Sequence, residues 1–285
     1  MFKKIQNFIR ENNLNFYDIA VMTPDGIESM KMQPCNHCND SYSVTKAFIT
    51  TGIGMLWDEG LISLDDPILK YLGKYFPEGC DPKWADVTIT HCLKHLIGID
   101  HEFFDIDSYS ANTFGTKDFL AFIFSRPLPY APGEFYKYTD SAFYLRGRVS
   151  HAVSGEYADR FLMRRLTAPL DFSEIAWSMC PHGHPMGGTG LYVKAEDMVK
   201  LAWLYKNKGV WNGQRILSEA WVDTVITRGF EFLRREESAD LIGKGGMHGQ
   251  MIMFSESHPY AFAWHSYEPT GRSKTLVSYI AECLR

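Results

Sequence analysis

The stretch Ser43-Val44-Thr45-Lys46 opens a long apolar segment with helical periodicity. Because residues three apart on a helix share a face, a helix that starts here would place the Ser43 hydroxyl beside the Lys46 amine. A serine becomes a nucleophile when a nearby base takes its proton, and a lysine is such a base if burial or a second cation lowers its pKa. The stretch is a minimal nucleophile and base pair, and its significance depends on what accompanies it.

Two further motifs follow along the chain. Residues 131–133, Ala-Pro-Gly, lead to Tyr138-Thr139-Asp140, where a phenol and a carboxylate stand two residues apart before another apolar helical segment. Residues 243–250, Gly-Lys-Gly-Gly-Met-His-Gly-Gln, precede the strand-like residues 251–254. Glycines in such a run allow the backbone to approach a ligand closely.

In this order, the three motifs resemble those of the penicillin-recognising serine hydrolases, which include class C β-lactamases, D-alanyl-D-alanine peptidases and related esterases and amidases. Residues 87–98 are similar to that family's stretch VTIRHLLTHTSG, and residues 187–198 to its stretch GGLxSTARDL. Residues 211–218 are similar to its helix-connecting turn. The resemblance therefore extends over nearly the whole chain.

The resemblance implies that the three motifs meet in one catalytic site. Ser43 would attack a carbonyl carbon, and Lys46 would accept or relay its proton. Tyr138 would act with Lys46 as the base and later protonate the leaving group, and the sequence leaves open which of the two is the base. The backbone N–H groups of Ser43 and Met247 would stabilise the oxyanion.

The glycine-rich motif and its neighbours would bind the substrate. Lys244 stands where the family carries a lysine or histidine, and it would bind a substrate carboxylate or tune Tyr138. Gly245 and Gly246 would line the same site. His248 has two interpretations, a substrate contact or a residue that packs and stabilises the loop.

Asp140 departs from the family, which usually has asparagine at this position. An amide both donates and accepts hydrogen bonds, whereas a carboxylate normally only accepts them. A β-lactam or an acyl peptide would therefore lose a donor to its carbonyl group. Asp140 would instead pair with Lys46 or Lys244, or select a substrate that bears an amine.

The sequence pattern predicts a mixed α/β (α+β) fold. Residues 2–13 have helical periodicity, and residues 16–22 and 27–32 read as strands that are joined by the turn Thr23-Pro24-Asp25-Gly26. Helical patterns dominate from residue 43 to about residue 177, strands return at 251–254 and 260–265, and a closing helix starts at about residue 273. The resemblance implies one β-lactamase-like catalytic domain over residues 1–285. An antiparallel sheet with terminal helices would occupy about 1–40 and 185–285, beside an all-helical lobe of about 41–184.

The composition is typical of a single globular enzyme. Of the 285 residues, 45% are hydrophobic and 22% charged, and the net charge of −5 gives no electrostatic reason to expect nucleic acid or an anionic membrane as a partner. Residues 1–11 lack the apolar run of a signal peptide, and no stretch reaches the roughly 20 apolar residues of a membrane span. We therefore expect a cytoplasmic protein whose partner is a small-molecule substrate. The oligomeric state is left open.

The six cysteines are expected to be reduced, because the chain is long and its first residues do not read as a secretory leader. Cys35 and Cys38 form a C-x-x-C motif, which can hold zinc or cycle as a dithiol. Zinc would need a second pair of ligands, and only His91, Cys92 and His95 offer one, at an unusual spacing. We favour an incidental role for the motif over a metal or redox role, and we expect no metal and no cofactor.

Three functions remain compatible with the sequence. The first is a serine hydrolase that acts on a small ester or amide through an acyl-enzyme on Ser43. The second is a penicillin-binding protein or a β-lactamase, which Asp140 disfavours. The third is a catalytically idle binding or sensor protein. Taken singly, Ser43, Lys46 and Tyr138 have ordinary structural explanations, but together and in the family's order they favour the first function.

Overall fold

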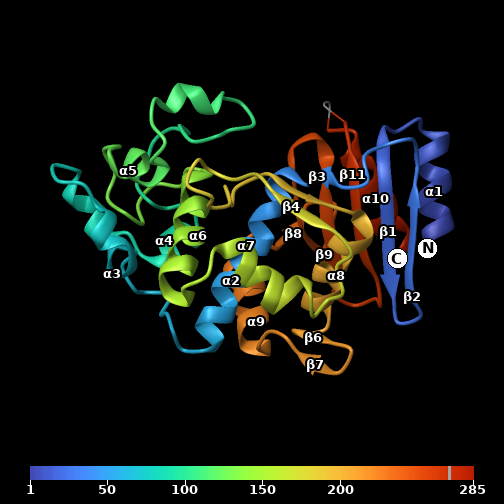
Figure 1. Ribbon diagram of the computed structural model, residues 1–285. Coiled ribbons are helices and arrows are strands. Elements are labelled where there is room, and N and C mark those ends of the chain that lie inside the picture. Colours follow the sequence, from blue (N-terminus) through green and yellow to red (C-terminus); the bar gives the residue numbers. More distant parts are fainter. Residues whose placement is uncertain (269–270) are drawn as a thin grey trace. The chain divides into compact units, whose positions relative to one another are not determined.

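The computed structural model describes residues 1–268 and 271–285 (Figure 1). The chain divides into two compact units, which are described separately. The first unit comprises Met1–Ala47, Thr167–Ala176 and Leu191–Arg285, and the second comprises Phe48–Leu166 and Trp177–Gly190. Helix α2 (Thr45–Asp58) begins in the first unit and continues in the second.

A six-stranded antiparallel sheet forms the centre of the first unit. Its strands, in spatial order, are β2 (Gly26–Lys31), β1 (Phe16–Thr23), β11 (Ala261–Ser266), β10 (Met251–Ser255), β9 (Ser238–Gly245) and β8 (Leu233–Arg235). Strands from both ends of the chain therefore pair in one sheet, as the sequence analysis predicts.

The hairpin between β1 and β2 confirms the turn that was predicted from sequence. Thr23 pairs with Gly26, so that Pro24 and Asp25 form a two-residue loop. Gly26 has a φ of 123°, which is disfavoured for a residue with a Cβ. The turn chemistry therefore sets the register of the two strands.

Both faces of the sheet are covered. Alternate residues of a strand point to opposite faces, and one face packs against the terminal helices α1 (Phe2–Glu11) and α10 (Ser273–Cys283) (Figure 1). Met253 and its strand partner Phe262 belong to this core. Helix α8 (Ala195–Lys206) packs against β1, β10 and β11. These strands are buried on both faces.

Short elements complete the first unit. Two small sheets have the strand orders β3-β5-β4 and β6-β7. These elements are β3 (Asn39–Asp40), the 3-10 turn η1 (Tyr42–Val44), β4 (Ile175–Trp177), β5 (Leu191–Val193), β6 (Val210–Trp211), β7 (Gln214–Arg215), α9 (Glu219–Arg228) and the turn η6 (Met247–Gly249). The glycine-rich motif is thus not one loop, because residues 243–245 belong to β9.

The second unit is mainly helical. Its elements, apart from α2, are α3 (Leu69–Leu72), η2 (Gly73–Tyr75), η3 (Pro82–Asp86), α4 (Ile89–Leu93), η4 (Ala111–Phe114), α5 (Phe119–Phe124), α6 (Ser141–Ser154), α7 (Ala158–Leu162) and the π-helical turn η5 (Met163–Thr167). The helical pattern ends earlier than residue 177, because Ile175–Trp177 pairs as a strand. Within the described ranges, every helix is too short or too polar to cross a membrane.

Candidate active site

The chain turns sharply just before Ser43. Tyr42 has a φ of 45°, in the left-handed region that a residue with a Cβ rarely adopts. Its N–H donates to the Asp40 carboxylate at 2.8 Å, and the Ser41 N–H donates to the Leu191 carbonyl at 2.8 Å. These bonds hold the strained turn, so that Ser43 lies at a defined place at the start of the helical segment.

Ser43 and Lys46 are in direct contact. The Lys46 Nζ donates to the Ser43 Oγ at 2.9 Å, as the spacing of three residues predicts. Lys46 is fully buried, and the neighbouring Thr45 hydroxyl accepts the Leu191 N–H at 3.2 Å. The first turn of the helix is therefore tied to β5, and the pair is held within proton-transfer distance.

Gly246 brings the glycine-rich motif against this turn. A Cβ on Gly246 would lie 2.6 Å from the Ser41 carbonyl oxygen and 3.2 Å from the Ser43 nitrogen. Only a glycine fits such an approach without a shift of the backbone. The next N–H along the chain is that of Met247, which the family resemblance assigns to the oxyanion hole together with the Ser43 N–H.

The loop that carries Met247 is fixed by several hydrogen bonds. Gln250 Nε2 donates to the Met247 carbonyl at 3.1 Å and to the Ser266 carbonyl at 2.7 Å. The Ser266 hydroxyl donates to the His248 carbonyl at 2.8 Å, and the Trp264 indole donates to the Gly249 carbonyl at 2.8 Å. A loop held in this way keeps its N–H groups preorganised.

His248 packs between two aromatic rings. Its imidazole stacks on Tyr267 with centroids 4.2 Å apart and meets Tyr42 edge-on at 5.2 Å. The residue has a φ of 58°. Of the two interpretations from sequence, these contacts favour the one in which His248 stabilises the loop.

Lys244 forms an ion pair that the sequence analysis does not anticipate. Its Nζ lies 2.6 Å from the Glu231 carboxylate, and both side chains are buried. Glu231 has a φ of 69° and follows α9, just before β8. No local signal marks Glu231 in the sequence, because its partner lies on a neighbouring strand and not on its own element.

Tyr138 and Asp140 belong to the second unit, where His95 organises their segment. The Tyr138 ring stacks on the His95 imidazole with centroids 4.5 Å apart. His95 also accepts the Thr139 N–H at its Nδ1 (3.1 Å), and its carbonyl accepts the Lys137 N–H (2.9 Å). His95 thus fixes the residues on both sides of Tyr138. It belongs to residues 87–98, one of the stretches on which the family resemblance rests.

Asp140 precedes α6 and lies in an acidic environment. Its N–H donates to the Glu102 carboxylate at 2.8 Å, and its carboxylate lies within 4.8 Å of those of Asp105 and Asp107. Burial raises the pKa of the Glu102 carboxyl, an effect that the negative charge of Asp140 increases and hydrogen bonds from the backbone oppose. The proximity of the Asp105, Asp107 and Asp140 carboxylates does not by itself identify a metal site.

Asp140 also packs tightly against a glycine. A Cβ on Gly188 would lie 2.5 Å from the Asp140 carboxyl carbon, so this position accepts no larger residue without rearrangement. Gly188 belongs to the stretch 187–198 on which part of the family resemblance rests. The close packing against Asp140 explains why this stretch has a glycine at position 188.

Both histidines that were considered as zinc ligands already have hydrogen-bond partners. His91 Nδ1 accepts the Thr88 N–H at the start of α4, and His95 accepts the Thr139 N–H. Burial, reinforced by Glu174, raises the pKa of the Cys38 thiol to about 11, which disfavours the reactive thiolate. Cys35 and Cys38 are both free thiols. These contacts favour the incidental interpretation of the C-x-x-C motif.

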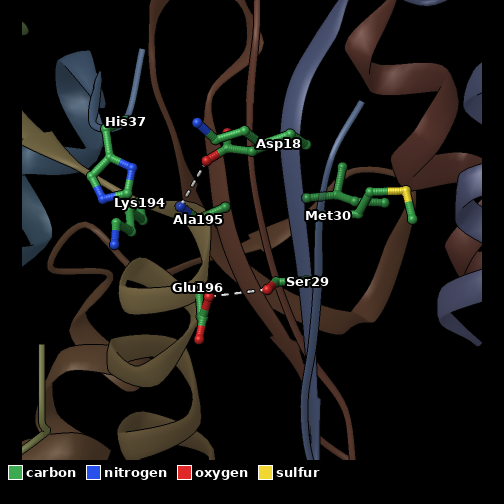
Figure 2. Close-up of a pocket in the computed structure, with 9 residues that line it drawn as sticks. Asp18, Ser29, Met30, His37, Lys194, Ala195 and Glu196 are labelled. Carbon is green, nitrogen blue, oxygen red and sulfur yellow. Dashed lines mark hydrogen bonds between the residues drawn. The ribbon is translucent and has the colours of Figure 1, made fainter. Parts of the chain in front are cut away.

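A separate pocket of about 230 Å³ lies in the first unit among β1, β2 and the start of α8 (Figure 2). Asp18 accepts the Ala195 N–H at 3.0 Å there, and Ser29 donates to Glu196 at 3.0 Å. None of the residues that line it belongs to the predicted site. These hydrogen bonds join the sheet to the first turn of α8.

The antiparallel sheet with its covering helices, together with the paired serine and lysine, defines a serine hydrolase with a β-lactamase-like fold. The chain belongs to the beta-lactamase family, whose sequence profile it matches over residues 28–276. The resemblance inferred from the motifs is thereby confirmed.

Solved structures share this fold. A penicillin-binding protein homologue from Caulobacter crescentus is 13% identical with a TM-score of 0.74, over 98% of this chain and 96% of that one. The penicillin-binding protein from Bacillus halodurans is 19% identical with a TM-score of 0.72, over 99% of each chain. A D-stereospecific amidohydrolase from a Streptomyces species is 16% identical with a TM-score of 0.71, over 96% of this chain and 97% of that one. At these identities the likeness concerns the fold.

Proposed function

We propose that this protein hydrolyses a small ester or amide through an acyl-enzyme on Ser43. The observation that carries the proposal is the 2.9 Å contact between Lys46 Nζ and Ser43 Oγ. Across that distance a neutral Lys46 would accept the serine proton as Ser43 attacks the carbonyl carbon. A developing oxyanion would then receive hydrogen bonds from the N–H groups of Ser43 and Met247.

Tyr138 is the proposed third member of the catalytic group. Its sequence position, two residues before Asp140 and after the Ala-Pro-Gly turn, supports this role, and so does the stacking on His95 that fixes its segment. Tyr138 would share the base function with Lys46 and protonate the leaving group. Water would then release the acyl group from Ser43 by the reverse proton transfers.

A fluorophosphonate probe followed by intact-mass measurement tests this proposal. The probe should add one label to the natural protein, and the Ser43→Ala variant should take up none while it keeps its circular dichroism spectrum. Ser278→Ala, on the exposed face of α10, is the matched control and should label fully. A label that persists on another serine of Ser43→Ala would overturn the assignment of the nucleophile.

Assays on the same purified protein distinguish the two alternative functions that the sequence leaves open. Turnover of the β-lactam nitrocefin at a rate comparable with that of an ester would favour a β-lactamase or a penicillin-binding protein. A folded natural protein that takes up no probe and hydrolyses no ester would instead favour an idle binding or sensor protein.

A further inference from the structure

The buried ion pair between Lys244 and Glu231 carries an inference about which substrates the site accepts. We infer that Glu231 cancels the charge of Lys244. The site would then prefer substrates that carry no carboxylate in the part of the molecule that contacts Lys244. The inference rests on the proposed function, because it concerns the selectivity of the same acyl-transfer site. Glu231 is then a specificity-determining residue.

Lys244 lies on the side of the sheet that faces the nucleophile. Alternate residues of an extended strand share a face, so that Lys244 and Gly246 point in the same direction. The Cβ position of Gly246 points at the Ser41 carbonyl oxygen and the Ser43 nitrogen. The lysine side chain therefore projects from β9 on the face where Ser43 lies.

The pairing of β9 with β10 supports this orientation. Lys244 pairs with Ile252, whereas the neighbouring Met251 and Met253 belong to the core beneath the terminal helices. Because residues opposite each other in an antiparallel pair point to the same face, Lys244 points away from that core. The ammonium group is thus not part of the packing against α1 and α10.

Glu231 is held in place for this contact. Helix α9 ends at Arg228 and is capped by Gly229, and the Glu231 N–H donates back to the Gly229 carbonyl at 3.1 Å. Its left-handed φ is uncommon for a residue with a Cβ. The strained backbone directs a buried carboxylate onto Lys244 at 2.6 Å, and an outlier of this kind is a reason to look for a functional role.

The electrostatic consequence follows from the burial of the pair. A lysine without a close counter-charge attracts a substrate carboxylate, which repays the cost of removing that anion from water. Lys244 already bonds to the Glu231 carboxylate, so the pair as a whole offers a substrate carboxylate no net positive charge. An uncharged acyl group would bear no such desolvation cost and should be preferred.

Two esters with acyl chains of similar length measure this preference. We would compare p-nitrophenyl butyrate, which is neutral, with the monoester p-nitrophenyl succinate, whose acyl chain ends in a carboxylate. Each kcat/KM is divided by the rate of spontaneous hydrolysis of that ester. The corrected ratio of anionic to neutral ester should be below one for the natural protein.

The Glu231→Gln variant keeps the size of the side chain and removes its charge. The corrected ratio should then rise about tenfold or more, the scale of one added charge-assisted hydrogen bond. Glu236→Gln is the control, because it changes the net charge equally at an exposed residue outside the site, and it should leave the ratio unchanged. Circular dichroism and thermal unfolding show whether each variant is folded.

The outcomes separate this inference from the proposed function. If the natural protein prefers the anionic ester, or if a folded Glu231→Gln variant keeps the natural ratio, the role of Glu231 is wrong while ester hydrolysis stands. If the natural protein hydrolyses neither ester and Ser43 takes up no probe, the proposed function itself fails. Should Glu231→Gln not fold, the ratio measured on the natural protein decides the question.

Discussion

At the scale of single residues, Lys46 and Tyr138 are expected to act as one unit, because neither is a competent base near neutral pH in its ordinary state. Residues that act as a unit lose activity non-additively. The double variant Lys46→Ala/Tyr138→Phe should be little slower in ester hydrolysis than the slower single variant. A complete kinetic cycle measures this, and fully additive losses in kcat would show independent roles.

Asp140 gives a second residue-scale prediction. Its carboxylate replaces the amide donor of the family's usual asparagine and lies among the acidic groups of Glu102, Asp105 and Asp107. We expect nitrocefin turnover to be poor in the natural protein. Asp140→Asn restores a donor and removes one negative charge, so this turnover should rise by about tenfold. The rise should appear in acylation, which stopped-flow absorbance resolves.

A p-nitrophenyl ester serves as the reference substrate for both forms. Efficient nitrocefin hydrolysis by the natural protein would contradict this account of Asp140. Loss of both activities in Asp140→Asn would indicate that the carboxylate supports the base instead of selecting the substrate.

At the scale of elements, the close approach of Gly246, directly after β9, to the turn before α2 should be sensitive to a single methyl group. Gly246→Ala places a Cβ against the backbone oxygen of Ser41, which has no flexible side chain to move aside. The backbone must shift, and misplacing one oxyanion donor typically costs about 10²-fold in rate. Steady-state kinetics on p-nitrophenyl butyrate should show this loss mainly in kcat.

Gly73→Ala is the control for that substitution, because an added Cβ at Gly73 has no neighbour within 4 Å. Its activity should equal that of the natural protein. Natural activity in Gly246→Ala would mean that the loop tolerates the shift and that its position is not critical for the reaction.

At the scale of the whole molecule, a buried histidine should make the stability depend on pH. Burial, followed by the positive charge of Arg148 and the nearby His151 and His182, lowers the pKa of His184 to about 3. The folded protein keeps this ring neutral, whereas the unfolded chain binds a proton near pH 6.5. Stability should therefore fall as the pH drops from about 6.5 towards 3.

Urea unfolding at pH 7, 6 and 5 tests this dependence. Between pH 7 and 5 the His184→Gln variant should lose about 1–2 kcal/mol less stability than the natural protein, because it lacks the shifted group. His101→Gln, at a histidine whose side chain is 72% exposed, is the control and should follow the natural protein. If the free energy of unfolding changed equally with pH in His184→Gln and in the natural protein, the prediction would be wrong.

Local patterns predicted a large part of the fold. The strands at residues 16–23 and 251–255 stand out as short apolar runs that are buried on both faces, and the hairpin turn depends on Pro24, Asp25 and Gly26 alone. The short strands at 39–40 and 175–177 have too few residues for any periodicity. They form because a distant segment supplies their hydrogen-bond partners.

The sequence by itself determined the contact of Ser43 with Lys46, because three positions along a helix fix which side chains share a face. Tertiary structure decided the pairing of Lys244 with Glu231 and the approach of Gly246 to Ser43. Those contacts join elements that are distant in the chain, and their geometry depends on strand register and on burial in the assembled sheet. Local propensity carries no information about such partners. The entropic cost of bringing them together and the interaction energy that they gain both arise only when the sheet forms.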